Sequence, residues 1–271
     1  MSPVTIEPPE YATNGYMSLL LQGHQDRRRI LIGVPMMGLI RSEWALARWA
    51  QYIPPNWSSS DCIQWINQMT PLGYSVADAR NLIVQTAVHN DFEWLFFIDS
   101  DVLLPPHCFV RLNAYMREGK TPVVAGLYFA KCSPAEPLVF RGRGNSYYGK
   151  WALGEKVWAD GIPMGCTLIH GSVLAAMYAE APAYLVTGTQ PCRQVFDTPK
   201  IVWMDPEQQG YRSFQGTEDL AWCDRVIKGE FLTKAGWTRI AKKKYPFLID
   251  TALFCQHIAE NGQRFPLELK W

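Results

Sequence analysis

Apolar runs alternate with amphipathic segments along the first half of the chain. Continuous apolar runs predict buried strands over residues 29–35, 93–98 and 122–129. Apolar positions at helical spacing predict helices over residues 40–52, 75–88 and 106–118, and the pattern of residues 63–69 fits either a strand or a short helix. In the second helix, Ser75 precedes Asp78 at the spacing of an N-terminal cap. This order of elements predicts a mostly parallel sheet covered on both faces.

The pattern becomes looser after Lys131. It predicts short strands near Val139 and over residues 156–158 and 166–169, helices over 172–178 and 217–228, and one strand with a loop in the tail 247–271. Residues 181–216 lack periodicity and are rich in Pro, Gly, Gln and Thr, so they predict a long loop. Long loops inside compact domains are commonly binding loops or lids.

Composition excludes several classes of protein. The chain has 271 residues, 48% of them hydrophobic, and a formal net charge of +1, which argues against a disordered chain and against a uniformly basic nucleic-acid coat. Its seven cysteines contain no C-x-x-C pair, as expected of reduced thiols in a cytoplasm. The start of the chain lacks a secretory signal, and the longest uncharged stretch, 161–179, is interrupted by Gly and Pro. We therefore expect a cytoplasmic protein (host cytoplasm if viral) with no membrane partner.

The clearest chemical signal follows the most apolar strand. Residues 93–98 run directly into Asp99-Ser100-Asp101. Ligands of open α/β sheets bind beyond the carboxyl ends of strands, and two carboxylates at this spacing can present oxygen ligands to Mg²⁺ or Mn²⁺. The alternative is a carboxylate turn that caps the next helix. The strongly apolar strand before the pair favours a functional site.

The segment FFIDSDVLLPP resembles the D-x-D strand end of GT-A glycosyltransferases, especially family-2-like enzymes of phage or bacteria. Five other segments resemble the family in the same order: IGVPMMG, VADARNLIV, ADGIPMGCTLIHGSVL, TEDLAWCDRV and DTALFCQHI. The resemblance implies a single GT-A-like α/β domain with a Rossmann-like, mostly parallel sheet flanked by helices. It would comprise an N-terminal extension (1–26), a nucleotide-sugar-binding half (27–131) and a loop-rich acceptor-binding half (132–271).

The resemblance also implies roles for individual residues. The donor, a nucleotide sugar and most simply a UDP sugar, would contact Pro35, Met36, Arg80, Asn81, Asp99, Ser100 and Gly165. A Mn²⁺ or Mg²⁺ ion would be bound directly by Asp101 and His257, with Asp99 reaching it through water or holding the ribose. The family's late His is followed by glycine, whereas Ala259 and Glu260 stand near His257 here.

Asp219 is the candidate general base, because an acceptor hydroxyl needs a carboxylate to take its proton as the sugar carbon is attacked. Glu218 beside it would orient the acceptor, and this arrangement favours inversion at the sugar carbon. The presence of each site residue can also be explained without a catalytic or binding role. His257 can be a packed histidine, Arg80 an exposed helix charge, and the acids after Thr217 an ordinary helix start.

The acceptor is less well defined. Basic clusters occur at Arg27–Arg29, at Arg141 and Arg143 with Tyr147, Tyr148 and Lys150, and at Lys242–Lys244. The usual explanation of such clusters is a solvated surface, but around one cleft they could follow a phosphate backbone. The resemblance implies the leading acceptor hypothesis, a hydroxymethylated pyrimidine in DNA, because phage-like enzymes similar to this family glycosylate such bases. Saccharide, small-molecule and protein acceptors stay open. The rival functions are a haloacid-dehalogenase-type phosphatase, whose D-x-D also follows a strand, and a non-catalytic nucleotide-sugar-binding module.

Overall fold

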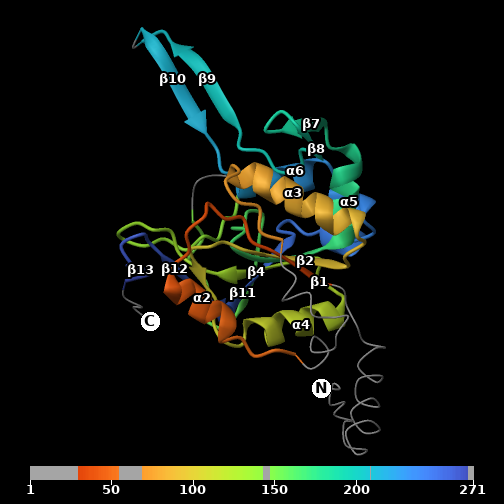
Figure 1. The fold of residues 1–271 in the computed structure, drawn as a ribbon, viewed down its shortest axis with the longest axis vertical. Coiled ribbons are helices and arrows are strands. Elements are labelled where there is room, and N and C mark those ends of the chain that lie inside the picture. The colour runs from red at the N-terminus through yellow and green to blue at the C-terminus, as the bar shows by residue number, and fades with distance from the viewer. Residues whose placement is uncertain (1–29, 55–68, 143–146, 208, 268–271) are drawn as a thin grey trace, which may run out of the picture.

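The computed structural model describes residues 30–54, 69–142, 147–207 and 209–267. Its centre is a six-stranded sheet in the order β1-β2-β6-β4-β11-β5 (Figure 1). The strands are β1 (Ile30–Gly33), β2 (Trp94–Ile98), β4 (Val123–Leu127), β5 (Lys156–Ala159), β6 (Cys166–His170) and β11 (Phe247–Phe254). The sheet thus joins strands from both predicted halves of the chain.

Four of these strands share one direction. β1 pairs with β2 in parallel, and β4 pairs with β11 in parallel. β6 runs antiparallel between β2 and β4, and β5 runs antiparallel along the outer edge of β11. The predicted α/β class with a mostly parallel, helix-flanked sheet is therefore confirmed.

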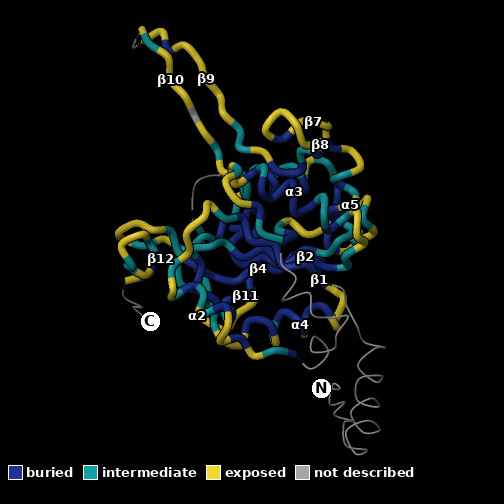
Figure 2. The backbone as a smooth tube through the Cα atoms, in the orientation of Figure 1, coloured by how far each residue is buried: buried dark blue, intermediate teal, exposed yellow. Residues whose placement is uncertain are grey.

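Two helical layers cover the sheet (Figure 1). α3 (Val76–His89), α5 (Gly171–Glu180) and α6 (Glu218–Lys228) lie on one face, while α2 (Ser42–Trp49) and α4 (Cys108–Glu118) lie on the other. Each face has its own apolar core. Ile83 of α3 and Trp222 of α6 belong to the first, and Phe109 of α4 belongs to the second. Figure 2 shows the resulting buried centre between exposed outer surfaces.

The predicted helices and strands of the first half are largely confirmed. Ser75 caps α3 by accepting a hydrogen bond from the Asp78 backbone N–H at 3.2 Å. α2 is shorter than predicted, and α4 begins at Cys108 instead of residue 106. The strand predicted near Val139 is only a set of isolated bridges at Phe140.

The prediction of a loop over residues 181–216 is wrong, because this segment forms two hairpins. They are β7 (Ala183–Val186) with β8 (Gln190–Arg193), and β9 (Lys200–Asp205) with β10 (Gly210–Gln215). The β9–β10 hairpin projects away from the body of the protein (Figure 1). Consecutive β9 side chains, Ile201 to Met204, are all exposed, so the hairpin lacks the apolar–polar alternation by which a strand is recognised.

The remaining elements are short. β3 (Val102–Leu103), β12 (Gln256–Ile258) and β13 (Arg264–Phe265) form a small separate sheet, and α7 (Phe231–Lys234) and α8 (Thr238–Ala241) precede β11. The tail thus holds three strands where one was predicted. The predicted extension 1–26, the cluster Arg27–Arg29, Arg143 and the element predicted at 63–68 lie outside the described residues. Within the described ranges, every helix falls short of the length and apolar character that crossing a bilayer requires.

Candidate functional site

The D-x-D turn lies at the carboxyl end of β2, as the sequence predicted. The backbone N–H of Asp99 donates to the Gly165 carbonyl at 3.0 Å, just before β6. The indole N–H of Trp44, on α2, donates to the Asp99 carbonyl at 2.8 Å. The turn is thus held by backbone contacts that leave both Asp99 and Asp101 side chains available for other partners.

Arg80 joins this turn to the start of α6. Its Nη2 donates to both carboxylate oxygens of Asp99, at 2.9 and 3.1 Å, and its Nε donates to Glu218 Oε1 at 3.2 Å. The guanidinium lies over the rings of Phe97 and Phe196, and the residue is 1% exposed. Arg80 is therefore neither an exposed helix charge nor open to a nucleotide base in this structure. It acts as a clamp between two carboxylates.

Asp99 has an unusual electrostatic environment. Burial raises its pKa to about 6, and the nearby charges of Asp101, Glu218 and Asp219 act in the same direction, against the opposing effect of Arg80. Three carboxylates, those of Asp99, Glu218 and Asp219, therefore act on the one buried guanidinium of Arg80, and Asp101 lies close enough to act on Asp99. Such a concentration of negative charge at a strand end suits a site that receives positive charge.

Asp101 has other partners than the Arg80 clamp and contacts His257 on β12. Its Oδ2 lies 3.4 Å from His257 Nε2 and 2.5 Å from Lys131 Nζ. Although burial alone would raise the pKa of Asp101, hydrogen bonds and charges from His257 and Lys131 lower it to about 2. The Nδ1 atom of His257 lies 2.9 Å from the Phe129 carbonyl, to which it can only donate, so Nε2 is directed at Asp101.

The Asp101–His257 pair fits part of a divalent-cation site. Ligand distances of about 2.1 Å place neighbouring donors of an octahedral ion about 3 Å apart, close to the observed separation. The backbone-bonded Nδ1 is the usual support of a metal-binding imidazole. Asp99 does not join the pair, since Arg80 holds both of its oxygens. Among the described residues no group of three or more His, Cys, Asp or Glu side chains is arranged to hold a metal, so other ligands would be water or phosphate.

Glu218 and Asp219 begin α6 and lie on the other side of the Arg80 clamp. Thr217 occupies the N-cap position but makes no capping hydrogen bond through its side chain. Asp219 Oδ1 accepts from the Leu220 backbone N–H at 2.7 Å. Burial, followed by the charge of Glu218, raises the pKa of Asp219 above its ordinary value. A carboxylate with a raised pKa is a better proton acceptor near neutral pH.

A pocket of about 480 Å³ opens where the N-termini of α3 and α6 converge. Its lining includes Asp78, Asn81, Asp197 and Glu218, but neither Asp101 nor His257. The Asn81 amide is already used within the protein: it donates to Tyr184 Oη and to the Phe196 carbonyl, both at 2.9 Å. Asn81 therefore supports the pocket wall.

The other predicted donor residues lie at the same sheet edge or close to it. Pro35 is buried two residues after the end of β1, and Met36 is half-buried and bridged to Leu72. Ser100 is half-buried in the D-x-D turn. Gly165 lies against Asp99, since a Cβ atom there would be 2.8 Å from Asp99 Oδ2 and 2.6 Å from Tyr128 Oη.

The close approach at Gly165 makes a first prediction. Gly165→Ala is expected to displace the Asp99 carboxylate or the buried Tyr128 ring and to lower the free energy of unfolding by about 1–3 kcal/mol, the cost of overpacking a buried site. Urea unfolding measures the effect. Gly149→Ala, where the added Cβ meets nothing within 4 Å, is the matched control. Equal free energies of unfolding of the two variants would contradict the assigned crowding.

Three residues of the site were missed by sequence reasoning. Lys131 pairs with Asp101, Trp44 holds the Asp99 carbonyl, and Tyr128 Oη accepts from the Gly165 N–H at 2.8 Å. Tyr128 and Lys131 follow β4, so the rule that ligands lie beyond the carboxyl ends of strands could have identified them. Trp44 has no comparable signal, because it looks like an ordinary apolar residue of an amphipathic helix.

The fold and the strand-end site together define a GT-A-like α/β protein. Among solved structures it is similar to A197 from STIV, with a TM-score of 0.51 and 17% identity over 88% of this chain and 90% of that chain. S. aureus TarS matches with a TM-score of 0.37 and 13% identity over 57% of this chain and 30% of that chain. TarS 1–349 in complex with UDP matches with a TM-score of 0.35 and 13% identity, over 57% and 50%. No family model and no curated protein matches the sequence.

Proposed function

We propose that this protein is a glycosyltransferase that uses a nucleotide sugar, a UDP sugar in the first instance, together with Mn²⁺ or Mg²⁺. One observation carries the proposal: Arg80 joins Asp99 of the D-x-D turn to Glu218 at the start of α6, and the chain neighbours of these two acids are the candidate metal ligand Asp101, paired with His257, and the candidate base Asp219. These are the two chemical functions that sugar transfer from a diphosphate requires.

In this mechanism the chain positions both reactants. Asp101 and His257 Nε2 would hold the divalent cation, whose chemistry would be to neutralise negative charge on the diphosphate. Lys131, which is paired with Asp101, would bind the same negative charge. Asp219 accepts the proton of the acceptor hydroxyl as the sugar carbon is attacked from the opposite side, which inverts that centre. Arg80 keeps Asp99 and Glu218 in place and does not itself react.

The rival functions fit the geometry less well. A phosphatase of the haloacid dehalogenase type needs the first aspartate of its D-x-D as a free nucleophile, whereas both Asp99 oxygens are hydrogen-bonded to buried Arg80. A non-catalytic binding module has no use for a buried carboxylate with a raised pKa, as Asp219 has. Both observations favour a transferase.

The basic clusters do not favour DNA over other acceptors. The chain segment Lys242–Lys244 directly precedes β11, at the amino-terminal edge of the sheet, whereas the D-x-D turn lies at the carboxyl-terminal edge. This cluster therefore does not share an edge of the sheet with the D-x-D turn. A hydroxymethylated pyrimidine remains one acceptor to assay beside saccharides and small molecules.

The donor proposal is tested by calorimetry of UDP binding with and without Mn²⁺. The parent protein is expected to bind UDP more tightly with the ion, and Asp101→Ala to lose that difference, a change of more than about tenfold. Asp224→Ala, an acid on the surface of α6, is the matched control and should keep it. If the parent protein binds UDP with the same affinity with and without Mn²⁺, the metal assignment is overturned. Failure to bind either UDP or GDP would overturn the donor class.

A further inference from the structure

Positive charge is concentrated in a segment that the proposed reaction does not use. Residues 236–245 contain Arg239, Lys242, Lys243 and Lys244 and no acidic residue, although the whole chain carries a formal net charge of only +1. These four cations are exposed. None of them forms a salt bridge with another described residue. The segment therefore presents its charge to the solvent.

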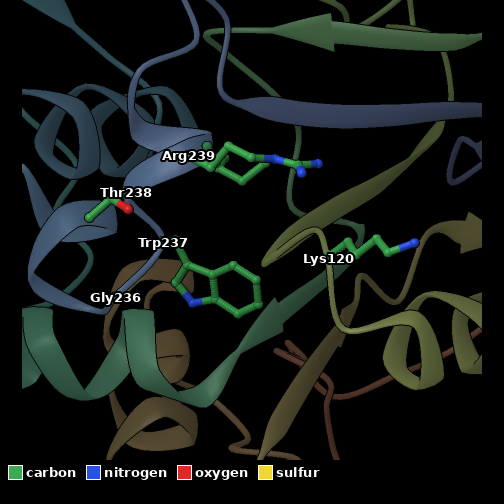
Figure 3. A pocket seen from close by; sticks show the side chains of 6 residues that line it. Lys120, Gly236, Trp237, Thr238 and Arg239 are labelled. Carbon is green, nitrogen blue, oxygen red and sulfur yellow. The ribbon is translucent and has the colours of Figure 1, made fainter.

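A pocket of about 210 Å³ lies within this region. Lys120, from the turn between α4 and β4, and Arg239, from α8, line it together with Trp237 (Figure 3). The Trp237 indole N–H donates to Ser172 Oγ at 3.0 Å, and its ring meets the edge of His170 with the centroids 5.1 Å apart. An aromatic ring held by the fold thus lines the same pocket as two cations.

The charge continues from this pocket to the edge strand of the sheet. Lys243 Nζ lies 4.0 Å from the centre of the Trp158 ring on β5, and Arg141 Nε donates to the Trp158 carbonyl at 2.7 Å. The Arg141 guanidinium and Lys244 Nζ lie 4.8 and 5.3 Å from the centre of the Tyr245 ring. We call this region the basic surface: Lys120, Arg141, Arg239, Lys242, Lys243 and Lys244.

The basic surface lies away from the candidate active site. Lys120 precedes β4 and Lys131 of the active site follows it, so the two mark opposite ends of one strand. Anything bound at the basic surface is therefore not placed to react at Asp101 or Asp219. Its role would be docking.

We propose that the basic surface is a docking surface for nucleic acid, contacted mainly through the phosphate backbone. Six cations spread from a pocket to a sheet edge suit a long polyanion better than a single phosphate. Trp237 lines one pocket together with Lys120 and Arg239, and an aromatic ring beside cations suits a base stacked next to its own phosphates. A lipid surface is disfavoured, since residues 236–245 include none of the large exposed hydrophobic side chains. The inference does not require that nucleic acid be the sugar acceptor.

The test measures binding of a labelled single-stranded oligonucleotide by fluorescence anisotropy over a range of salt concentrations. The variant Arg239→Gln/Lys242→Gln/Lys244→Gln keeps Lys243, which packs on Trp158. It is expected to lose about tenfold or more in affinity at low salt, and its log–log salt slope should fall by about 2–3. Lys200→Gln/Lys228→Gln/Lys234→Gln removes the same charge elsewhere and should bind like the parent.

Further measurements distinguish a loss of charge from a loss of folding, and nucleic acid from other partners. Lys242→Arg/Lys244→Arg keeps the charge and should retain binding. Mn²⁺-dependent UDP binding by the glutamine variant reports an intact active site independently of docking. An unchanged salt slope in that variant overturns the proposal, as does an oligonucleotide that fails to bind the parent. Stronger charge-dependent binding to heparin or to phosphatidylserine vesicles than to the oligonucleotide would assign the surface to another polyanion and also overturn it.

Discussion

Asp219→Asn is expected to reduce sugar transfer by about 10²–10⁴-fold while UDP binding stays at the parental level, because general-base catalysis contributes about that much and the amide cannot accept the proton. Asn preserves the shape of the side chain and its hydrogen bond to the Leu220 N–H. The measurement is the initial rate of transfer at saturating donor, with calorimetry of UDP binding beside it. Transfer at the parental rate would show that Asp219 is not the base.

The matched control is Asp224→Asn on the same helix, where the carboxylate pairs with Lys228 at the surface. The same chemical change there should leave transfer unchanged. A pH profile provides a second readout. Since the pKa of Asp219 is raised, the parental rate should fall toward acid at a higher pH than an ordinary aspartate would require, because protonation removes the base.

Arg80→Leu is expected to destabilise the protein by about 3 kcal/mol and to abolish Mn²⁺-dependent UDP binding. The substitution leaves the Asp99 and Glu218 carboxylates near each other without a counter-charge, and breaking a buried ion pair costs about 3–5 kcal/mol. We expect a destabilisation at the lower end of this energy range because the Asp99 side chain is 25% exposed. Urea unfolding measures the loss of stability. Arg80→Lys should also be impaired, since an ammonium group cannot reproduce the planar fork that contacts both acids.

A double-mutant cycle distinguishes the clamp from simple packing. Asp99→Asn removes the charge that Arg80 neutralises, so Arg80→Leu should cost less in the Asp99→Asn background than in the parent. Strictly additive free energies of unfolding would contradict the clamp and would assign the loss to the contacts of Arg80 with Phe97 and Phe196.

The parts of the site that could be predicted are those with a local signal. A wholly apolar strand ending in two aspartates places Asp99 and Asp101 at the carboxyl edge of a sheet, and the structure has them there. The acids that begin α6 likewise follow from an ordinary helix start. The β9–β10 hairpin could not be predicted, because both of its faces carry exposed apolar side chains and no alternation marks it as a strand.

The sequence by itself determined the α/β class, the order of the main elements and the position of the D-x-D turn, because each depends on hydrophobic periodicity within one segment. Only the tertiary structure decided which charges meet. Arg80 reaches Glu218 across 138 positions of the chain, and Asp101 turns to His257 while Asp99 turns to Arg80. Neighbouring side chains on one turn point in different directions, and their partners come from elements brought together by the sheet. Tertiary packing therefore places Asp99 in the Arg80 clamp and Asp101 in the candidate metal-binding pair with His257.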